Sequence, residues 1–331
     1  ITTPGGERYP TVTKAISDDM FKGQLVYTYL GHGGPTSLTQ ERVLKASDIL
    51  DWDNQYKLPL MITATCTFNG FDDPSITNAG EEAIHSRVKG AIALFSTVRA
   101  VYSDDNFLLT SSALKHLIEQ QNGSYLTLGE TLRKAKNENS STGILENSRK
   151  FMMFGDPAQN LALPKHSLAV TSINDKSISA VPDTFSSLQT VKVSGYVAQH
   201  NGDKLGNFNG KLYINIFDKP SKLTTRGNDK GSYPRDYYVQ KNTIFKGIAA
   251  IKNGDWEFSF IIPKDINYSL GQGKMSLYAT DEKNTDAASY FEGFYIGGTS
   301  SDSLVDDKPP VVQLFMNDDK FVTGGITDEN P

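Results

Sequence analysis

The spacing of apolar residues divides the chain into two parts. Before Lys165, segments with apolar residues three and four positions apart alternate with short continuous apolar runs. This is the pattern of helices that alternate with buried parallel strands. Beyond Lys165, apolar and polar residues alternate with a period of two, and helical spacing almost disappears. The pattern predicts an α/β domain over residues 1–164 and an all-β domain over residues 165–300.

Within the first part, the apolar runs predict strands and the periodic segments predict helices. The expected strands are residues 25–30, 57–65 and 90–96, with edge elements at 151–154 and 161–163. The expected helices are residues 12–22, 38–52, 80–88, 106–121 and 126–137. Gly23 is expected to end the first helix, because glycine readily adopts the left-handed conformation of a helix C-terminus.

The second part contains short alternating runs separated by turn residues. The expected strands include residues 190–197, 211–217, 256–263 and 274–279. Such strands predict an immunoglobulin-like sandwich, here without the cysteines of antibody domains. Residues 301–331 are interpreted as a linker and the start of a further β domain, with a strand over 311–315.

Two of the predicted strands end in residues that can carry out nucleophilic chemistry. The strand 25–30 runs into Gly31-His32-Gly33-Gly34, and the strand 57–65 runs into Cys66. The intervening segment 38–52 would form the crossover helix of a right-handed unit with parallel strands. The carboxyl ends of both strands then meet at one edge, where sites of open α/β sheets form. A thiol beside an imidazole is the arrangement that cysteine nucleophiles require.

Composition excludes several other classes of protein. A length of 331 residues, 38% of them hydrophobic and 21% charged, indicates a globular chain of two domains. The single cysteine rules out an internal disulfide and a thiolate zinc cluster. A net charge of -5 argues against a nucleic-acid groove, and no apolar run reaches the length of a membrane span.

The motifs around His32 and Cys66 resemble those of the gingipain-type (C25) cysteine peptidases, a family with a caspase-like fold. The matching segments are Tyr29–Gly34, Leu60–Cys66, Phe71–Pro74, Gly90–Leu94, Thr97–Arg99 and Phe154–Pro157. The resemblance is strong over residues 1–164. Within the family it is strongest to the sortase-like peptidase of the bacterial type IX secretion system, which removes C-terminal sorting domains from secreted cargo. A caspase-like domain has strands before the histidine-bearing one, so the first strands of the sheet are expected to lie outside this chain.

The resemblance implies a role for three residues. Cys66 would be the nucleophile, His32 would transfer the proton, and the amides of Gly33 and Cys66 would form the oxyanion hole. A thioester would form and be resolved by water or by an amine acceptor. The implied substrate is a secreted polypeptide with a C-terminal sorting domain, and other secretion-system proteins are possible partners. The implied location is the bacterial cell surface or outer membrane, and no cofactor or metal is implied.

Several residues keep two interpretations. Arg99, Tyr102 and Trp52 could line the substrate cleft or be structural. Asp72 and Asp73 could orient a base or only form the turn before Pro74. A lone cysteine such as Cys66 is more often a small buried hydrophobe. The other histidines, which lie in surface-like contexts, are His85, His116, His166 and His200. The alternative function is a non-catalytic scaffold that docks cargo or partners in a surface secretion assembly.

Overall fold

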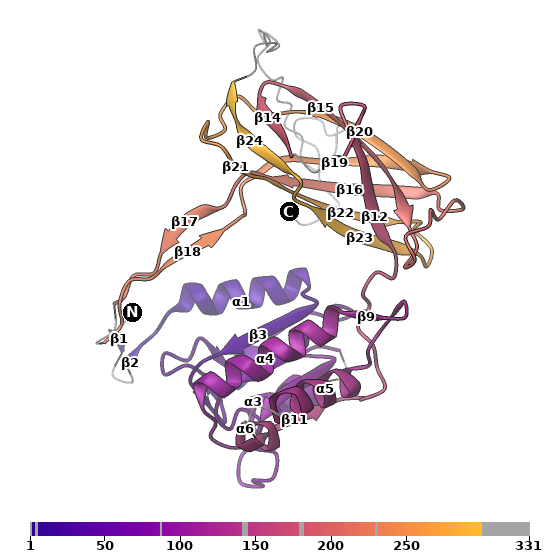
Figure 1. Cartoon of the computed structure of the whole chain (residues 1–331). Helices are drawn as coiled ribbons and strands as arrows, with labels where there is room; N and C mark the ends of the chain where they lie inside the picture. The colour runs from indigo at the N-terminus through magenta and orange to yellow at the C-terminus, as the bar shows by residue number, and fades with distance from the viewer. Residues whose placement is uncertain are drawn as a thin grey trace, which may run out of the picture. The chain divides into compact units, whose positions relative to one another are not determined.

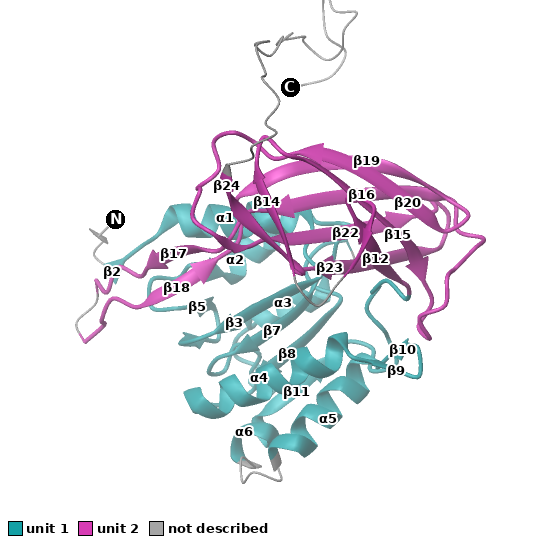
Figure 2. Cartoon of the chain, turned by 45° about the horizontal axis from the view of Figure 1, so that its top comes forward, with its two compact units in different colours: residues 1–165 teal, residues 166–331 magenta. Residues whose placement is uncertain are grey.

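The structure is a computed structural model that describes residues 2–3, 6–86, 88–140, 145–178, 182–228 and 231–299. The chain divides into two compact units, residues 1–165 and 166–331 (Figure 1 and Figure 2). The predicted linker and strand within residues 301–331 lie outside the described residues.

A four-stranded sheet with the order β11-β8-β7-β3 organises the first unit. Its strands are β3 (Val26–Leu30), β7 (Leu60–Ala64), β8 (Ala93–Thr97) and β11 (Phe151–Phe154). β3, β7 and β8 are parallel, and β11 runs antiparallel along β8. The parallel pairing of β3 with β7 confirms the predicted crossover unit. The segment 161–163, expected as an edge element, is not a strand.

Every residue of β7 is buried, because helices cover both faces of this sheet. Leu60 and Ile62 pack with residues of α4 (Ser103–Ile118) and α5 (Leu128–Ser140). Met61 points to the opposite face, as alternation along a strand requires, and packs with residues of the remaining helices. These are α1 (Pro10–Lys22), α2 (Ala46–Leu50) and α3 (Ala79–His85), while α6 (Leu145–Lys150) precedes β11. The layers are visible in Figure 1.

The helix predicted over residues 38–52 was wrong for most of its length. The segment instead forms β5 (Ser37–Leu38) and β6 (Leu44–Lys45), which join β4 (Gly33–Gly34) in a small antiparallel sheet. Only α2 is helical. Thr39 and Arg42 have positive φ angles of 60° and 55°, which a right-handed helix cannot contain. Leu38, Leu44 and Ile49 do reach the core, but from two short strands and one helical turn, while Leu50 is exposed.

The other predicted helices are present with shifted ends. α1 begins at Pro10 and ends before Gly23, whose φ is 99° and whose amide donates to the carbonyls of Asp19 and Met20. This confirms the predicted end of the helix. Four short strands complete the unit: β1 (Thr2–Thr3), β2 (Gly6–Glu7), β9 (Gln120–Gln121) and β10 (Ser124–Tyr125).

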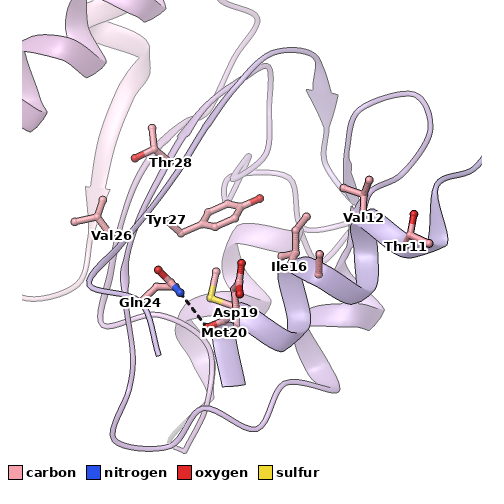
Figure 3. Close-up of a pocket in the computed structure, with 10 residues that line it drawn as sticks. Thr11, Val12, Ile16, Asp19, Met20, Gln24, Val26, Tyr27 and Thr28 are labelled. Atoms are coloured by element: carbon pink, nitrogen blue, oxygen red, sulfur yellow. Dashed lines mark hydrogen bonds between the residues drawn. The ribbon is translucent and has the colours of Figure 1, made fainter. Parts of the chain in front are cut away.

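β3 is an edge strand, which pairs with β7 on one side only within the described residues. A groove of about 360 Å³ lies between this strand and α1 (Figure 3). Val12, Ile16 and Met20 line the helical side, and Val26 and Tyr27 line the strand side. The free edge of β3 therefore lies beside a partly apolar surface.

The second unit is all-β within its described residues. Its main sheet is antiparallel, with the order β13-β12-β15-β20-β19-β16-β22-β23. The strands are β12 (Ser167–Ile173), β13 (Lys176–Ser177), β15 (Thr190–Ala198), β16 (Gly210–Phe217), β19 (Thr243–Lys252), β20 (Asp255–Ile261), β22 (Lys274–Thr280) and β23 (Asp286–Phe291). The sheet curls so that Ala288 donates to the carbonyl of His166, next to the first strand.

A second sheet with the order β14-β24-β21 contributes to the same core. Its strands are β14 (Asp183–Ser187), β21 (Gly271–Gln272) and β24 (Phe294–Thr299). Phe185 and Phe294 from this sheet join the buried residues of the main sheet, such as Ile214. The predicted change from helical to period-two structure after Lys165 is confirmed.

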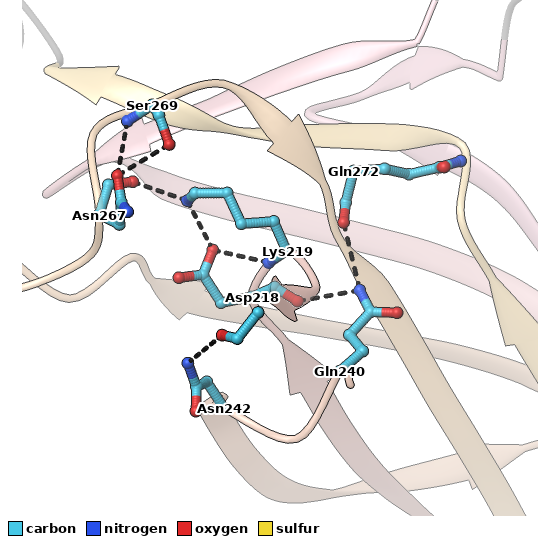
Figure 4. Close-up of polar contacts among 8 residues, drawn as sticks. Asp218, Lys219, Gln240, Asn242, Asn267, Ser269 and Gln272 are labelled. Carbon is cyan, nitrogen blue, oxygen red and sulfur yellow. Dashed lines mark hydrogen bonds and ion pairs between the residues drawn. The ribbon is translucent and has the colours of Figure 1, made fainter. Parts of the chain in front are cut away.

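A two-stranded ribbon, β17 (Ser221–Thr224) and β18 (Asp236–Val239), forms a separate sheet. Its base is held by polar contacts (Figure 4). Lys219 donates to the Asp218 carboxylate, 2.9 Å away, and both side chains are nearly buried. Lys219 also donates to the carbonyl of Asn267, and Gln240 donates to that of Asp218. These bonds fix where the ribbon leaves the main sheet.

Candidate active site

His32 and Cys66 follow neighbouring strands at the same edge of the sheet. Leu30 of β3 is paired with Ala64 of β7, and the amide of Gly31 donates to the Ala64 carbonyl at 3.3 Å. Each candidate residue lies two positions beyond this last pair. The structure thus brings the Gly-His-Gly-Gly turn and the cysteine turn together, as parallel pairing predicted.

The backbone of His32 is fixed by two hydrogen bonds to its carbonyl oxygen. The amide of Thr39 donates at 2.8 Å, and the hydroxyl of Tyr29 donates at 2.6 Å. The residue itself is exposed. A solvent-exposed imidazole can exchange protons with a substrate.

Gly33 packs directly against the residue that precedes the cysteine. A Cβ atom added at Gly33 would lie 2.6 Å from Oγ1 of Thr65, so only glycine fits without displacing that side chain. The Thr65 carbonyl accepts a hydrogen bond from the Thr97 hydroxyl of β8. The histidine turn, the cysteine turn and β8 are therefore in contact through Thr65.

The ladder between β4 and β5 leaves the Gly33 amide unused. Gly33 lies opposite Leu38 in this ladder. The adjacent residues, His32 and Thr39, also lie opposite each other, and the Thr39 amide donates to the His32 carbonyl. In an antiparallel ladder this arrangement marks a pair whose own N–H groups point away from the partner strand. The Gly33 N–H is therefore directed away from β5.

Cys66 is half-buried, and its Sγ lies 3.9 Å from the carbonyl oxygen of Val101. The next residue, Thr67, has a φ of 49°. A β-branched residue in the left-handed region is uncommon and strained. The cysteine is thus presented at a tight turn and remains partly accessible to solvent.

Arg99, which could line the substrate cleft or be structural, forms an ion pair with Asp72. Its Nη1 donates to Asp72 Oδ1 at 2.9 Å, its Nη2 donates to Oδ2, and Nη1 also bonds the Val98 carbonyl. The bond from Arg99 holds the pKa of Asp72 below its ordinary value, and the same bond raises the pKa of Arg99. The pair connects the turns that follow β7 and β8.

A pocket of about 370 Å³ lies beside this pair and next to the cysteine turn. Thr67, Asp72 and Arg99 line it together with Pro35 and Asn78. Because Thr67 directly follows Cys66, the pocket borders the turn that contains the cysteine. Asp73, also in its lining, accepts bonds from the Ser75 amide and hydroxyl, which fits the turn-forming interpretation.

Tyr102 and Trp52 occupy different environments. Tyr102 is 62% exposed, its backbone bonds the side chain of Asn147, and the ammonium of Lys150 lies over its ring, 5.6 Å from the centroid. Trp52 is buried in the core beside α2, which supports the structural interpretation. Among the other histidines, His116 bonds Glu138 at 2.9 Å. Within the described ranges, no group of three or more His, Cys, Asp or Glu residues could hold a metal ion.

The contacts of Tyr29, Thr65 and Thr97 had no counterpart in the sequence interpretation. The sequence could have indicated Tyr29 and Thr65 only by their positions, because Tyr29 lies three residues before His32 and Thr65 directly precedes Cys66. Both lie within the motif segments, where any side chain on a strand end is close to the site.

Residues 1–162 match the sequence model of peptidase family C25. The sequence of the first unit therefore matches the C25 family, as its motifs predicted. No curated protein matches the chain.

Among solved structures, the chain is similar to dimeric latent PorU from Porphyromonas gingivalis, with 27% identity and a TM-score of 0.43. That match covers 72% of this chain and 23% of PorU. A second match is the Arg-specific cysteine proteinase gingipain R, with 14% identity and a TM-score of 0.43, covering 86% of this chain and 55% of the gingipain. The chain thus spans under a quarter of the first relative and about half of the second. None of the described helices is long and apolar enough to span a membrane.

Proposed function

We propose that the protein is a cysteine endopeptidase in which Cys66 is the nucleophile and His32 the acid–base group. The observation that carries the proposal is the pairing of Leu30 with Ala64, the last pair between β3 and β7. His32 and Cys66 each follow this pair by two residues and therefore lie at the same edge of the sheet. The match of residues 1–162 to a cysteine peptidase family supports the same chemistry.

The reaction follows from these two groups. The Cys66 thiol gives its proton to the His32 imidazole, and the thiolate forms a bond to the peptide carbonyl carbon. The resulting oxyanion accepts hydrogen bonds from the amides of Gly33 and Cys66, the first of which points away from β5. The C–N bond then breaks, and His32 protonates the leaving amine. Water or an amine attacks the thioester, returns a proton to His32 and releases the thiolate.

The proposed substrate is a secreted polypeptide with a C-terminal sorting domain, and an amine acceptor would make the reaction a transpeptidation. The pocket beside Asp72 and Arg99 would receive a side chain near the scissile bond, with Arg99 as a wall of the pocket. The exposed ring of Tyr102 would contact the substrate as well. We place the protein at the bacterial cell surface, where such cargo would be met, together with other secretion-system proteins as partners. The caspase-like architecture of the first unit, the immunoglobulin-like sandwich of the second and their boundary near residue 164 belong to the same proposal.

Removal of the nucleophile tests this function. Cys66→Ala should abolish cleavage of a cargo polypeptide that carries a C-terminal sorting domain, and its circular dichroism spectrum should not change. Alanine differs from cysteine by one sulfur atom at a half-buried position, so the fold loses little packing. His32→Ala should lower the rate of cleavage by orders of magnitude in the same assay. Full cleavage by the Cys66→Ala protein would refute the proposal.

A further inference from the structure

The residue that holds the candidate histidine in place lies three positions before it. Tyr29 is on β3, and its hydroxyl donates to the His32 carbonyl oxygen at 2.6 Å. Between the two residues stands Gly31, where an added Cβ would lie 2.7 Å from the Tyr29 hydroxyl oxygen and 3.1 Å from Cζ. The tyrosine side chain therefore folds along the strand over Gly31, and this close approach requires the absence of a side chain there.

The ring and the hydroxyl of Tyr29 have separate roles. The ring packs against the buried cluster formed by residues such as Leu38 and Leu44, so its position is set by the core. The hydroxyl extends from that fixed ring to the His32 carbonyl. Burial raises the pKa of Tyr29, which keeps the phenol protonated and able to donate near neutral pH. The charge of Glu41 acts in the same direction, and the bond to Thr39 opposes it.

The His32 carbonyl thus accepts one hydrogen bond from the small sheet and one from the core. The Thr39 amide belongs to the turn after β5, whereas the Tyr29 ring belongs to the core under β3. Without the second bond, the His32 carbonyl would be held by the small sheet alone. Glycines on both sides of His32 give this turn wide conformational freedom, so a single additional bond changes it strongly.

We infer that Tyr29 is a positioning residue, which orients the His32 backbone so that the imidazole stays beside the Cys66 thiol. This inference rests on the proposed function, because it assigns a role toward His32. Tyr29 contacts no reacting atom. Its effect should appear as the loss of a stabilised thiolate and not as a loss of folding.

The strand supplies a matched control. Tyr27 lies two residues earlier on the same face and packs against the same cluster. Burial raises its pKa to about 12, as burial raises that of Tyr29. Within the described residues, no hydrogen bond of the Tyr27 hydroxyl is found. Tyr27→Phe and Tyr29→Phe therefore remove the same atom from the same strand face, but only the second change removes a hydrogen bond from the His32 carbonyl, which keeps its bond from the Thr39 amide.

Alkylation of the full chain by iodoacetamide provides the assay, because Cys66 is its only cysteine. The rate would be measured from about pH 5 to about pH 9 for each variant. A thiol beside an imidazolium ionises well below the ordinary value of about 8.5. We expect Tyr29→Phe to slow alkylation at about pH 6 by at least about fivefold and to change it less than about twofold at about pH 9, where a thiol of ordinary pKa is mostly ionised. Tyr27→Phe should follow wild type throughout.

A second variant disturbs the same contact from the glycine side. Gly31→Ala places a methyl group against the Tyr29 side chain and, because Gly31 has a φ of 155°, also strains the backbone beside His32, so it should lose the low-pH reactivity while the tyrosine is still present. A profile of Tyr29→Phe that coincides with wild type, while His32→Ala loses the low-pH reactivity, would overturn the inference and leave the proposed function intact. Faster alkylation at about pH 9 would indicate local unfolding and would also overturn it. If His32→Ala itself matches wild type, the proposed dyad fails first, and the role inferred for Tyr29 fails with it.

Discussion

At the scale of single residues, the turn after β7 combines a reactive group with backbone strain. Thr67 follows Cys66 with a φ of 49°, and its side chain is β-branched. A non-glycine residue in this region costs about 1–3 kcal/mol. By contrast Asn253, with a φ of 50°, begins an Asn-Gly hairpin turn in which asparagine is readily accommodated. The strain at Thr67 therefore lies directly beside the candidate nucleophile.

Thr67→Gly should relieve this strain and raise the free energy of unfolding of the first unit by about 1 kcal/mol. The same change should lower the rate of substrate cleavage by about tenfold, because the turn that presents Cys66 becomes more mobile. Trp52 fluorescence in a Trp256→Phe background reports on the first unit, since these are the only two tryptophans. Asn253→Gly is the control, and a decrease in stability for Thr67→Gly would contradict the prediction.

At the scale of elements, the Asp72–Arg99 pair joins the turns after two adjacent strands. Both side chains are about half exposed, so the pair is expected to add little to global stability. Its bidentate geometry does, however, fix the relative position of the turns that border the pocket. The pair should therefore affect substrate binding more than folding.

Arg99→Lys is expected to raise KM for a peptide substrate severalfold, while the thermal midpoint changes little, because lysine keeps the charge but loses the two-pronged bond. The swap Asp72→Arg with Arg99→Asp should restore part of the lost affinity. Steady-state kinetics and a melting curve for each variant test this, and an unchanged KM for Arg99→Lys would remove the pair from the substrate site.

The pH range of this pair separates it from the dyad. The bond from Arg99 lowers the pKa of Asp72 in the folded protein. The ionised carboxylate therefore stabilises the folded state at pH values above its ordinary pKa of about 4. That contribution is lost only as pH falls through the lowered value. Changes in Cys66 reactivity between about pH 5 and about pH 9 therefore report on the thiol and imidazole and not on the Asp72–Arg99 pair.

At the scale of the whole molecule, each unit has its own hydrophobic core. The buried cluster of the second unit is formed only by residues from Leu168 to Ile296. The two clusters of the first unit are formed by residues from Ile16 to Leu161. The candidate catalytic residues all belong to the first unit. Because chemistry resides in a site and not in a fold, the all-β unit is expected to have no catalytic role.

Ile214→Asp should unfold the second unit and leave the alkylation profile of Cys66 unchanged. Ile214 is 1% exposed in the middle of β16, and an unpaired buried carboxylate there costs several kcal/mol. Ile62→Asp is the matched change in the first unit, also at 1% exposure, and should abolish the low-pH reactivity of Cys66. Loss of that reactivity in the Ile214→Asp protein would show that the second unit contributes to the site.

The sequence by itself determined the features that depend on local burial. Apolar runs of the right length predicted β3, β7 and β8, and the change of period at Lys165 predicted the all-β unit. Glycines and turn residues after two strands located His32 and Cys66 at one sheet edge. The sequence failed at residues 38–52, where apolar spacing alone does not distinguish a helix from two short strands joined by residues with positive φ.

Only the tertiary structure decided which distant side chains become partners. Asp72 meets Arg99 because the turns after β7 and β8 are neighbours, and Thr97 bonds the Thr65 carbonyl for the same reason. Tyr29 lies close to His32 in sequence, yet its bond depends on a core that fixes the ring. Periodicity records how deeply each residue is buried. The choice of partner depends on how strands and turns pack, which is a property of the whole unit.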